Sequence, residues 1–179
     1  MSHPQRIIIP GGSGQVGRIL ARHFQALGND VTVLSRNRTP YAWPVIARDS
    51  ITQGAWIQAL ENSDVCINLT GRSVNCRYNP ANRREITESR VKSTQLLNQV
   101  IGALRSPPRV WLNASTATIY RHSLDRPMDE ATGELGGNEP GGARYLELLD
   151  QCRQGLGTSF LCSSHTAHAQ SGAAQRHHV

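Results

Sequence analysis

The chain has 179 residues, and 38% hydrophobic and 18% charged residues are typical of a single globular domain with a buried core. Its apolar runs span only a few residues, so we expect neither a membrane span nor a secretory signal, and we predict a cytoplasmic protein. The net charge of +6 comes from arginines spread along the chain without interleaved aromatic residues, so no nucleic-acid partner is expected. The four cysteines lack the spacing of a zinc site or a disulfide framework, and no metal site is predicted.

Short apolar strands alternate along the chain with helical patterns. The β-branched run at 6–10 stops at two glycines, as a buried parallel strand would. After Gly14, apolar residues recur at helical spacing until Gly28, and a second strand follows at 30–35. Further strands are expected at 45–47, 64–69 and 109–114, with helices at 54–60 and about 80–104. This alternation predicts an α/β fold, a Rossmann-type doubly wound parallel sheet with helices on both faces.

A glycine-rich segment joins the first strand to the first helix. It reads Gly11-Gly12-Ser13-Gly14-Gln15-Val16-Gly17, which contains the spacing Gly-x-x-Gly-x-x-Gly. Such glycines allow a tight turn, a close approach of the backbone to a pyrophosphate, and close packing of helix on strand. The pattern alone is weak evidence, but its position between a strand and a helix predicts a dinucleotide-binding turn.

The end of the second strand distinguishes NAD from NADP in such folds, through an acid for the ribose hydroxyl or a cation for a 2′-phosphate. Here Ser35 and Arg36 occupy that position, and no acid is present. A serine hydroxyl and a guanidinium can both bind phosphate oxygens, so NADP(H) is the expected cofactor and NAD(H) the less favoured one. The alternative is that Arg36 is a solvated loop charge.

The chain resembles the extended short-chain dehydrogenase/reductase superfamily, the NAD(P)-dependent epimerases and dehydratases. More narrowly it is similar to atypical epimerase-family proteins often described as cell-division-inhibitor-like. The segments that carry the resemblance are 11–17, 67–71, 82–97 and 113–120.

The resemblance implies that the cofactor is also lined by Asp49, Asn68, Leu69, Thr70, Gly71 and Ser115, and that Thr116 hydrogen-bonds the reacting oxygen of the substrate. The alternatives are that Ser115 and Thr116 are ordinary strand-end hydroxyls, that Asn68 is a turn former, and that Arg83, Arg84 and Arg90 form a solvated helix face.

The chain lacks the Tyr-x-x-x-Lys pair, in which a lysine lowers the pKa of a tyrosine so that it can act as acid or base. Its only lysine is Lys92, and the residue four positions before it is Glu88. Two functional classes therefore stay open: an NADP(H)-binding epimerase/dehydratase-like oxidoreductase acting on a small molecule, or a non-catalytic cofactor-binding or regulatory protein.

The character of the sequence changes after Pro140, and we expect an NAD(P)-binding domain at 1–140 followed by a poorly ordered tail at 141–179. Permitted codons from Arg144 onward, read one base later, encode DTWNFSINVGKAWERA, which resembles the family's next segment. A frameshifted, truncated and inactive product is therefore a third hypothesis, in which the Rossmann-type sheet is incomplete at the C-terminus and the last strands and the substrate domain are missing. The nucleotide sequence at codon 144 would test it.

Overall fold

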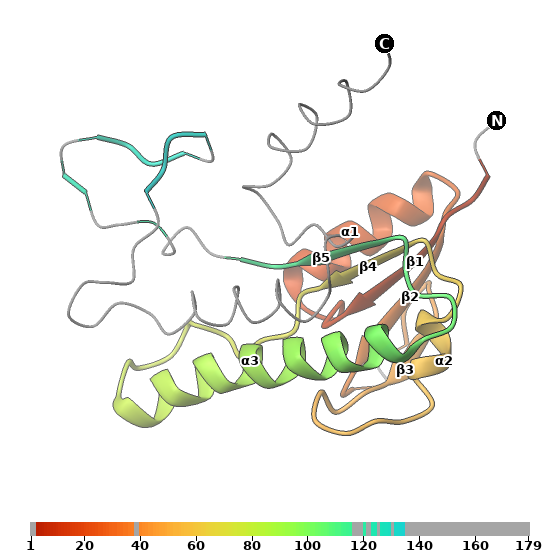
Figure 1. Cartoon of the computed structure of the whole chain (residues 1–179), viewed down its shortest axis with the longest axis horizontal. Coiled ribbons are helices and arrows are strands. Elements are labelled where there is room, and N and C mark those ends of the chain that lie inside the picture. The colour runs from red at the N-terminus through yellow and green to blue at the C-terminus, as the bar shows by residue number, and fades with distance from the viewer. Residues whose placement is uncertain are drawn as a thin grey trace, which may run out of the picture. The chain divides into compact units, whose positions relative to one another are not determined.

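The computed structural model describes residues 3–37, 40–115, 120, 123–124, 126–129 and 131–134. The chain divides into two compact units, Met1–Ala114 and Ser115–Val179, each described by itself. The helices and sheet strands of the described residues belong to the first unit (Figure 1). No helix among the described residues is both long and apolar enough to cross a bilayer.

The predicted strands and helices are all present. In chain order they are β1 (Arg6–Pro10), α1 (Gln15–Ala26), β2 (Asp30–Ser35), β3 (Val45–Ala47), α2 (Ile57–Leu60), β4 (Val65–Asn68), α3 (Pro80–Ala103) and β5 (Val110–Asn113). The one clear difference is α2, which begins three residues after its predicted start because Gly54 opens a turn in which its carbonyl accepts from the Ile57 N–H at 3.0 Å.

All five strands are parallel, in the order β3-β2-β1-β4-β5, which confirms the predicted Rossmann-type sheet. The chain therefore winds in one direction from β1 to β3, then returns to place β4 on the other side of β1. In such sheets ligands bind beyond the carboxyl ends of the strands, at the point where the direction of winding reverses.

Successive residues of β1 point to opposite faces of the sheet. Ile7 and Ile9 form a core cluster with Ala21 of α1 and Val33 of β2, whereas Ile8 is buried on the other face. Figure 1 shows α3 running along the side of the sheet away from α1. Crossovers between parallel strands are right-handed, so the direction of each step across the sheet decides which face its helix covers. The step from β1 to β2 runs opposite to the step from β4 to β5, and α1 and α3 therefore lie on opposite faces.

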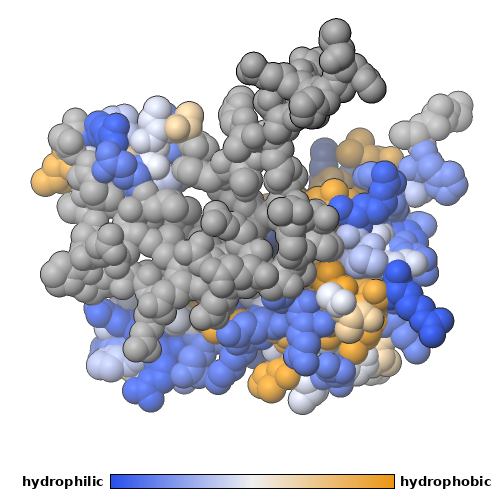
Figure 2. Space-filling view, in the orientation of Figure 1, coloured by the Kyte–Doolittle hydropathy of each residue, from blue (hydrophilic) through white to orange (hydrophobic). Residues whose placement is uncertain are grey.

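The long helix α3 has a defined start and end. The Asn79 side chain caps it by accepting from the Asn82 N–H at 2.8 Å, and Pro80 occupies its first turn. It buries Leu97, Val100 and Ile101 and leaves its opposite side in solvent. Figure 2 shows mainly hydrophilic side chains at lower left, where α3 begins.

In the second unit, Asp129 accepts hydrogen bonds from the N–H groups of Ala131 and Thr132 at 3.0 and 2.7 Å and closes a turn. The predicted catalytic Thr116, the boundary near residue 140 and the tail at 141–179 lie outside the described residues. The predicted division into 1–140 and 141–179 therefore stays a prediction.

Candidate functional site

The glycine turn begins at the carboxyl end of β1. Gly11 has a φ of +77°, and a Cβ there would lie 2.7 Å from the carbonyl carbon of Leu69. Its N–H donates to the Leu34 carbonyl oxygen at 2.8 Å, which fixes the turn to the end of β2. Only glycine fits this position, because both the backbone conformation and the approach of the β4 end exclude a side chain.

Gly17 and Gly14 serve different purposes. A Cβ on Gly17 would lie 2.4 Å from the Cα of Gly12, so this glycine permits α1 to pack against the turn. Gly14 is in an extended conformation, and an added Cβ would meet only the Gly11 carbonyl oxygen at 3.5 Å. The fold itself therefore does not require a glycine at position 14, which lines the cavity described next.

A cavity of about 680 Å³ lies at the carboxyl ends of the strands. Its size is within the range of cofactor sites. The start of α1 borders it with no acidic residue and no capping side chain in the first turn, so its N–H groups and the positive end of the helix dipole are available to an anion. The lining residues from the strand ends and their turns are Gly11, Ser13, Gly14, Leu34, Ser35, Arg36, Asn37, Arg48, Asp49, Ser50, Ile51, Leu69, Thr70, Gly71 and Arg72; α3 adds Glu85, Glu88, Ser89 and Lys92.

The end of β2 presents hydroxyl and guanidinium groups to the cavity. The Ser35 Oγ donates to the Ser13 Oγ at 2.8 Å and accepts from the Asn37 N–H at 3.2 Å, so the hydroxyl is fixed beside the glycine turn. Arg36 lines the cavity and its side chain is exposed. No carboxylate stands among residues 35–37.

Asp49 also lines the cavity, but its carboxylate accepts hydrogen bonds from the turn that follows it. One oxygen accepts from the N–H groups of Ile51 and Thr52 at 2.9 and 2.8 Å, and the other from the Thr52 hydroxyl at 2.6 Å. The hydroxyl bond and the backbone N–H bonds lower the pKa of Asp49 to about 2. This carboxylate therefore shapes the loop after β3, in addition to any contact it makes with a ligand.

Arg48 is a lining residue that sequence reasoning missed. It is only 3% exposed, and its guanidinium donates to Ser50, Thr70 and Ser93. Burial lowers its pKa to about 10, so it carries its charge at neutral pH. The available signal was its position directly after a strand, the same position that drew attention to Arg36.

Asn68 ends β4, and its side chain makes hydrogen bonds within the fold. This side chain is 2% exposed and does not line the cavity. Its Nδ2 donates to the Asn113 Oδ1 at 2.6 Å, and its Oδ1 accepts from the Thr70 N–H at 3.1 Å. Asn68 therefore ties β4 to β5 and forms the turn that presents Leu69, Thr70 and Gly71, and the turn-forming alternative is the one that the contacts support.

Four further predicted residues do not line the cavity. Gly12 lies beneath the turn, where a Cβ would meet Val33 Cγ2 at 2.8 Å, and Gly17 packs against Gly12. Gln15 and Val16 form the first turn of α1, and the Val16 side chain is exposed. Ser115 belongs to the second unit, so its relation to the cavity is not described, and Thr116 lies outside the described residues.

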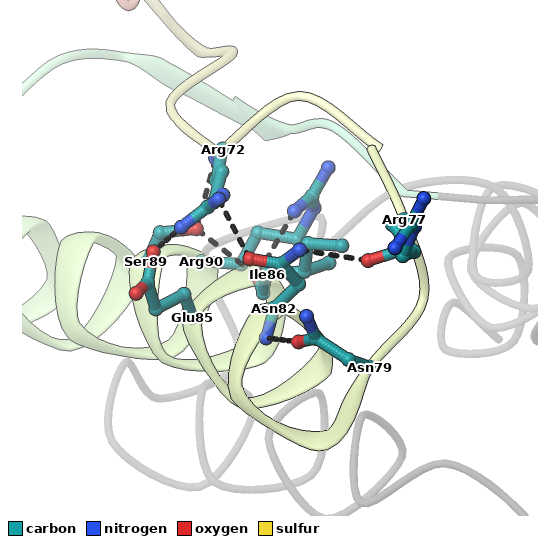
Figure 3. Close-up of polar contacts among 8 residues, drawn as sticks. All are labelled: Arg72, Arg77, Asn79, Asn82, Glu85, Ile86, Ser89 and Arg90. Atoms are coloured by element: carbon teal, nitrogen blue, oxygen red, sulfur yellow. Dashed lines mark hydrogen bonds and ion pairs between the residues drawn. The ribbon is translucent and has the colours of Figure 1, made fainter. Parts of the chain in front are cut away.

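The loop after β4 is fastened to the start of α3, as Figure 3 shows. Arg72 donates through Nη2 to the Asn82 Oδ1 at 2.8 Å and pairs with Glu85, while its N–H donates to the Ser89 Oγ at 2.9 Å. Arg90 lies across Gly71, with its Cζ 3.0 Å from where a Cβ would stand. Arg90 is therefore half-buried and does not belong to a solvated face, whereas Arg83 and Arg84 are exposed as expected.

Glu88 and Lys92 complete the α3 wall. They form an ion pair of 2.8 Å one helical turn apart, and the hydrogen bond from Lys92 lowers the pKa of Glu88. Among the described residues, no three His, Cys, Asp or Glu side chains are grouped so that they could hold a metal ion.

Comparisons with known proteins identify relatives of this chain. An "Epimerase family protein SDR39U1" of Bos taurus is 30% identical over 128 residues, and an epimerase family protein of Staphylococcus haemolyticus is 30% identical over 120 residues. These matches cover 70% and 67% of this chain but only 41% and 40% of the relatives, so the chain spans about two fifths of their length.

A crystal structure of human SDR39U1 (isoform 2) with NADPH superposes with a TM-score of 0.66 at 26% identity, covering 89% of this chain and 50% of that one. The model of the "NAD dependent epimerase/dehydratase family" matches residues 7–146, six residues past the boundary expected from the sequence. A match over this much of the chain, on a Rossmann-type sheet with a glycine turn, assigns the family. This chain belongs to the NAD-dependent epimerase/dehydratase family.

Proposed function

We propose that the first unit binds NADP(H) in the cavity at the carboxyl ends of β1, β2 and β4, as the cofactor domain of an epimerase/dehydratase-like oxidoreductase. The observation that carries the proposal is the convergence of the glycine turn, the free start of α1, and Ser35 with Arg36 on one cavity. Backbone N–H groups at a helix start favour a pyrophosphate, and a serine with an arginine favours a further phosphate.

The residues present fit such a cofactor. Gly14 leaves open space beside the first turn of α1, where a pyrophosphate needs close approach to the backbone. The cavity wall from Leu69 to Gly71 is free of bulky polar side chains that would obstruct a nucleotide. When bound, the nicotinamide cofactor supplies hydride transfer.

The preference for NADP(H) over NAD(H) follows from the charges at the end of β2. An NAD site requires an acid that accepts from the ribose hydroxyls, and residues 35–37 offer none. The nearby Asp49 already accepts three hydrogen bonds within its own turn. The NADPH present in the human relative's crystal structure is consistent with this preference.

Thr116 is the group that we propose for catalysis, as a hydrogen-bond donor that polarises the reacting oxygen of a small-molecule substrate. The free thiols Cys66 and Cys76 fit a reducing compartment, and the cytoplasmic location is part of the proposal. A non-catalytic cofactor-binding protein would bind NADP(H) equally well, so oxidation of NADPH with carbonyl substrates by the full chain separates the two functions.

The binding test is calorimetric titration of the full chain with NADPH and NADH. We expect tighter binding of NADPH, and we expect Arg36→Ala to weaken NADPH binding by about tenfold to a hundredfold, the loss of a charge-assisted contact, while NADH binding changes little. Arg22→Ala is the matched control, because it removes the same charge from an exposed position on α1 that does not line the cavity. Equal affinity of the parent chain for both cofactors would refute the assignment.

A further inference from the structure

A single buried guanidinium connects three walls of the cavity. Arg48 follows β3 directly, and its Nη1 donates to the Ser50 Oγ and to the Thr70 Oγ1, both at 3.2 Å. Its Nη2 donates to the Ser93 Oγ at 3.2 Å, in the middle of α3. The loop after β3, the loop after β4 and α3 therefore meet at one side chain.

Burial of this charge is costly, and the contacts show what offsets the cost. A buried charge needs hydrogen bonds or a counter-ion. Among residues 3–37 and 40–115 no ion pair to Arg48 is formed, and its hydrogen-bond acceptors are all neutral oxygens. The guanidinium also lies over the Trp56 ring, 4.8 Å from the centroid, and its Nε is buried without a partner.

The backbone of Arg48 also contacts the end of β2, which is a fourth wall of the cavity. The Arg48 N–H donates to the Ser35 carbonyl oxygen at 3.0 Å, and the Ser35 hydroxyl in turn donates to Ser13 of the glycine turn. An ammonium group has a single nitrogen atom, whereas the planar fork of Arg48 places separate nitrogen atoms on Thr70 and on Ser93.

We propose that Arg48 is a positioning residue of the dinucleotide cavity, whose fork fixes the loop after β3, the loop after β4 and α3 relative to one another. It acts on the ligand through the walls it holds and makes no contact that discriminates the 2′-phosphate. The effect on cofactor affinity rests on the proposed function, whereas the coupling of the three walls does not.

The first test uses the full chain without cofactor. In Arg48→Lys, which keeps the charge and loses the fork, hydrogen exchange should rise together, by about tenfold, in the segments 49–52, 69–72 and 90–95. Arg109→Lys is the matched control, because its guanidinium pairs with Asp64 at the opposite ends of the strands and is 81% exposed. Ser93→Ala removes one acceptor and should raise exchange in the same segments to a smaller extent. Unchanged exchange in these segments in Arg48→Lys would overturn the proposal.

The second test measures NADPH and NADH affinity of the same variants. Arg48→Lys should weaken both by the same factor, about tenfold, and leave their ratio unchanged, unlike Arg36→Ala. If Arg48→Lys shows faster exchange but binds both cofactors as tightly as the parent chain, Arg48 has a purely structural role. If the ratio of NADPH to NADH affinity collapses in this variant, Arg48 is a direct phosphate ligand. Either result contradicts the proposal. If the parent chain binds neither cofactor, the proposed function fails, and the exchange experiment alone decides the role of Arg48.

Discussion

Gly14 and Gly17 belong to the same motif, yet a side chain at each would have a different effect. Gly14→Val adds atoms where the structure has space, so the fold should persist while the side chain occupies the expected pyrophosphate position. We expect NADPH affinity to fall at least about a hundredfold, or about 3 kcal/mol, with a nearly unchanged melting temperature.

Gly102→Val is the control for that experiment, since Gly102 has no neighbour within 4 Å of an added Cβ and does not line the cavity. Gly17→Ala should instead destabilise the whole domain, because its Cβ would collide with Gly12. If Gly14→Val binds NADPH as tightly as the parent chain, the glycine at this position has no role in cofactor binding.

The lowered pKa of Asp49 predicts that the stability of the folded chain depends on pH. Its pKa is about 2 in the folded chain against an ordinary value of 3.8, so its contribution is fully present above pH 3.8 and is lost as pH falls toward 2. The difference in stability between the parent and Asp49→Ala in denaturant titrations should therefore be largest at pH 6 and should shrink as pH falls from 4 to 3. A difference that stays constant over this range would show that the charge of Asp49 does not stabilise its turn.

The sequence indicated the glycine turn, Ser35 and Arg36 because each is a residue type with a known use at a strand end. It did not indicate Arg48, because a surface arginine and a buried one look the same in a sequence, and only the positions of Thr70 and Ser93 distinguish them. The contact of Asn68 with Asn113 was not visible in the sequence for the related reason that the two residues are 45 positions apart.

At the scale of elements, the loop after β4 depends on its contact with α3. Glu85→Gln breaks the pair with Arg72 (Figure 3), so hydrogen exchange in residues 71–79 should rise about twofold to fivefold, the value of a partly exposed ion pair. Glu88→Gln removes the same charge from the same wall but breaks a pair within α3, and it should leave this loop unchanged. Equal effects of the two variants would attribute the change to net charge and not to the Arg72 contact.

The elements themselves were largely predictable. Apolar runs that stop at glycines or at Asn-Leu-Thr-Gly mark the strands, and the apolar spacing marks α1 and α3. The start of α2 was predicted three residues early, at Gly54. Residues 54–56 instead form a turn, in which Trp56 Nε1 donates to the Thr52 carbonyl oxygen at 3.2 Å.

For the molecule as a whole, alternation of strands and helices predicted a parallel sheet but not the order of its strands. That order depends on where the connection from β3 to β4 crosses the sheet, and the short helix predicted at 54–60 does not indicate on which side of β1 the next strand lies. The sheet order β3-β2-β1-β4-β5 and the lining residues at the ends of β1, β2 and β4 together place the cavity at the reversal point.

Among the described residues, those that line the cavity all fall between Gly11 and Lys92, and the last strand of the sheet ends at Asn113. Synthesis from the N-terminus therefore delivers these lining residues early. A nascent chain could bind its cofactor on the ribosome soon after β5 leaves the exit tunnel. Since a ligand that binds only the folded form stabilises it by mass action, a nicotinamide cofactor bound at the proposed site would then act as a folding aid during translation.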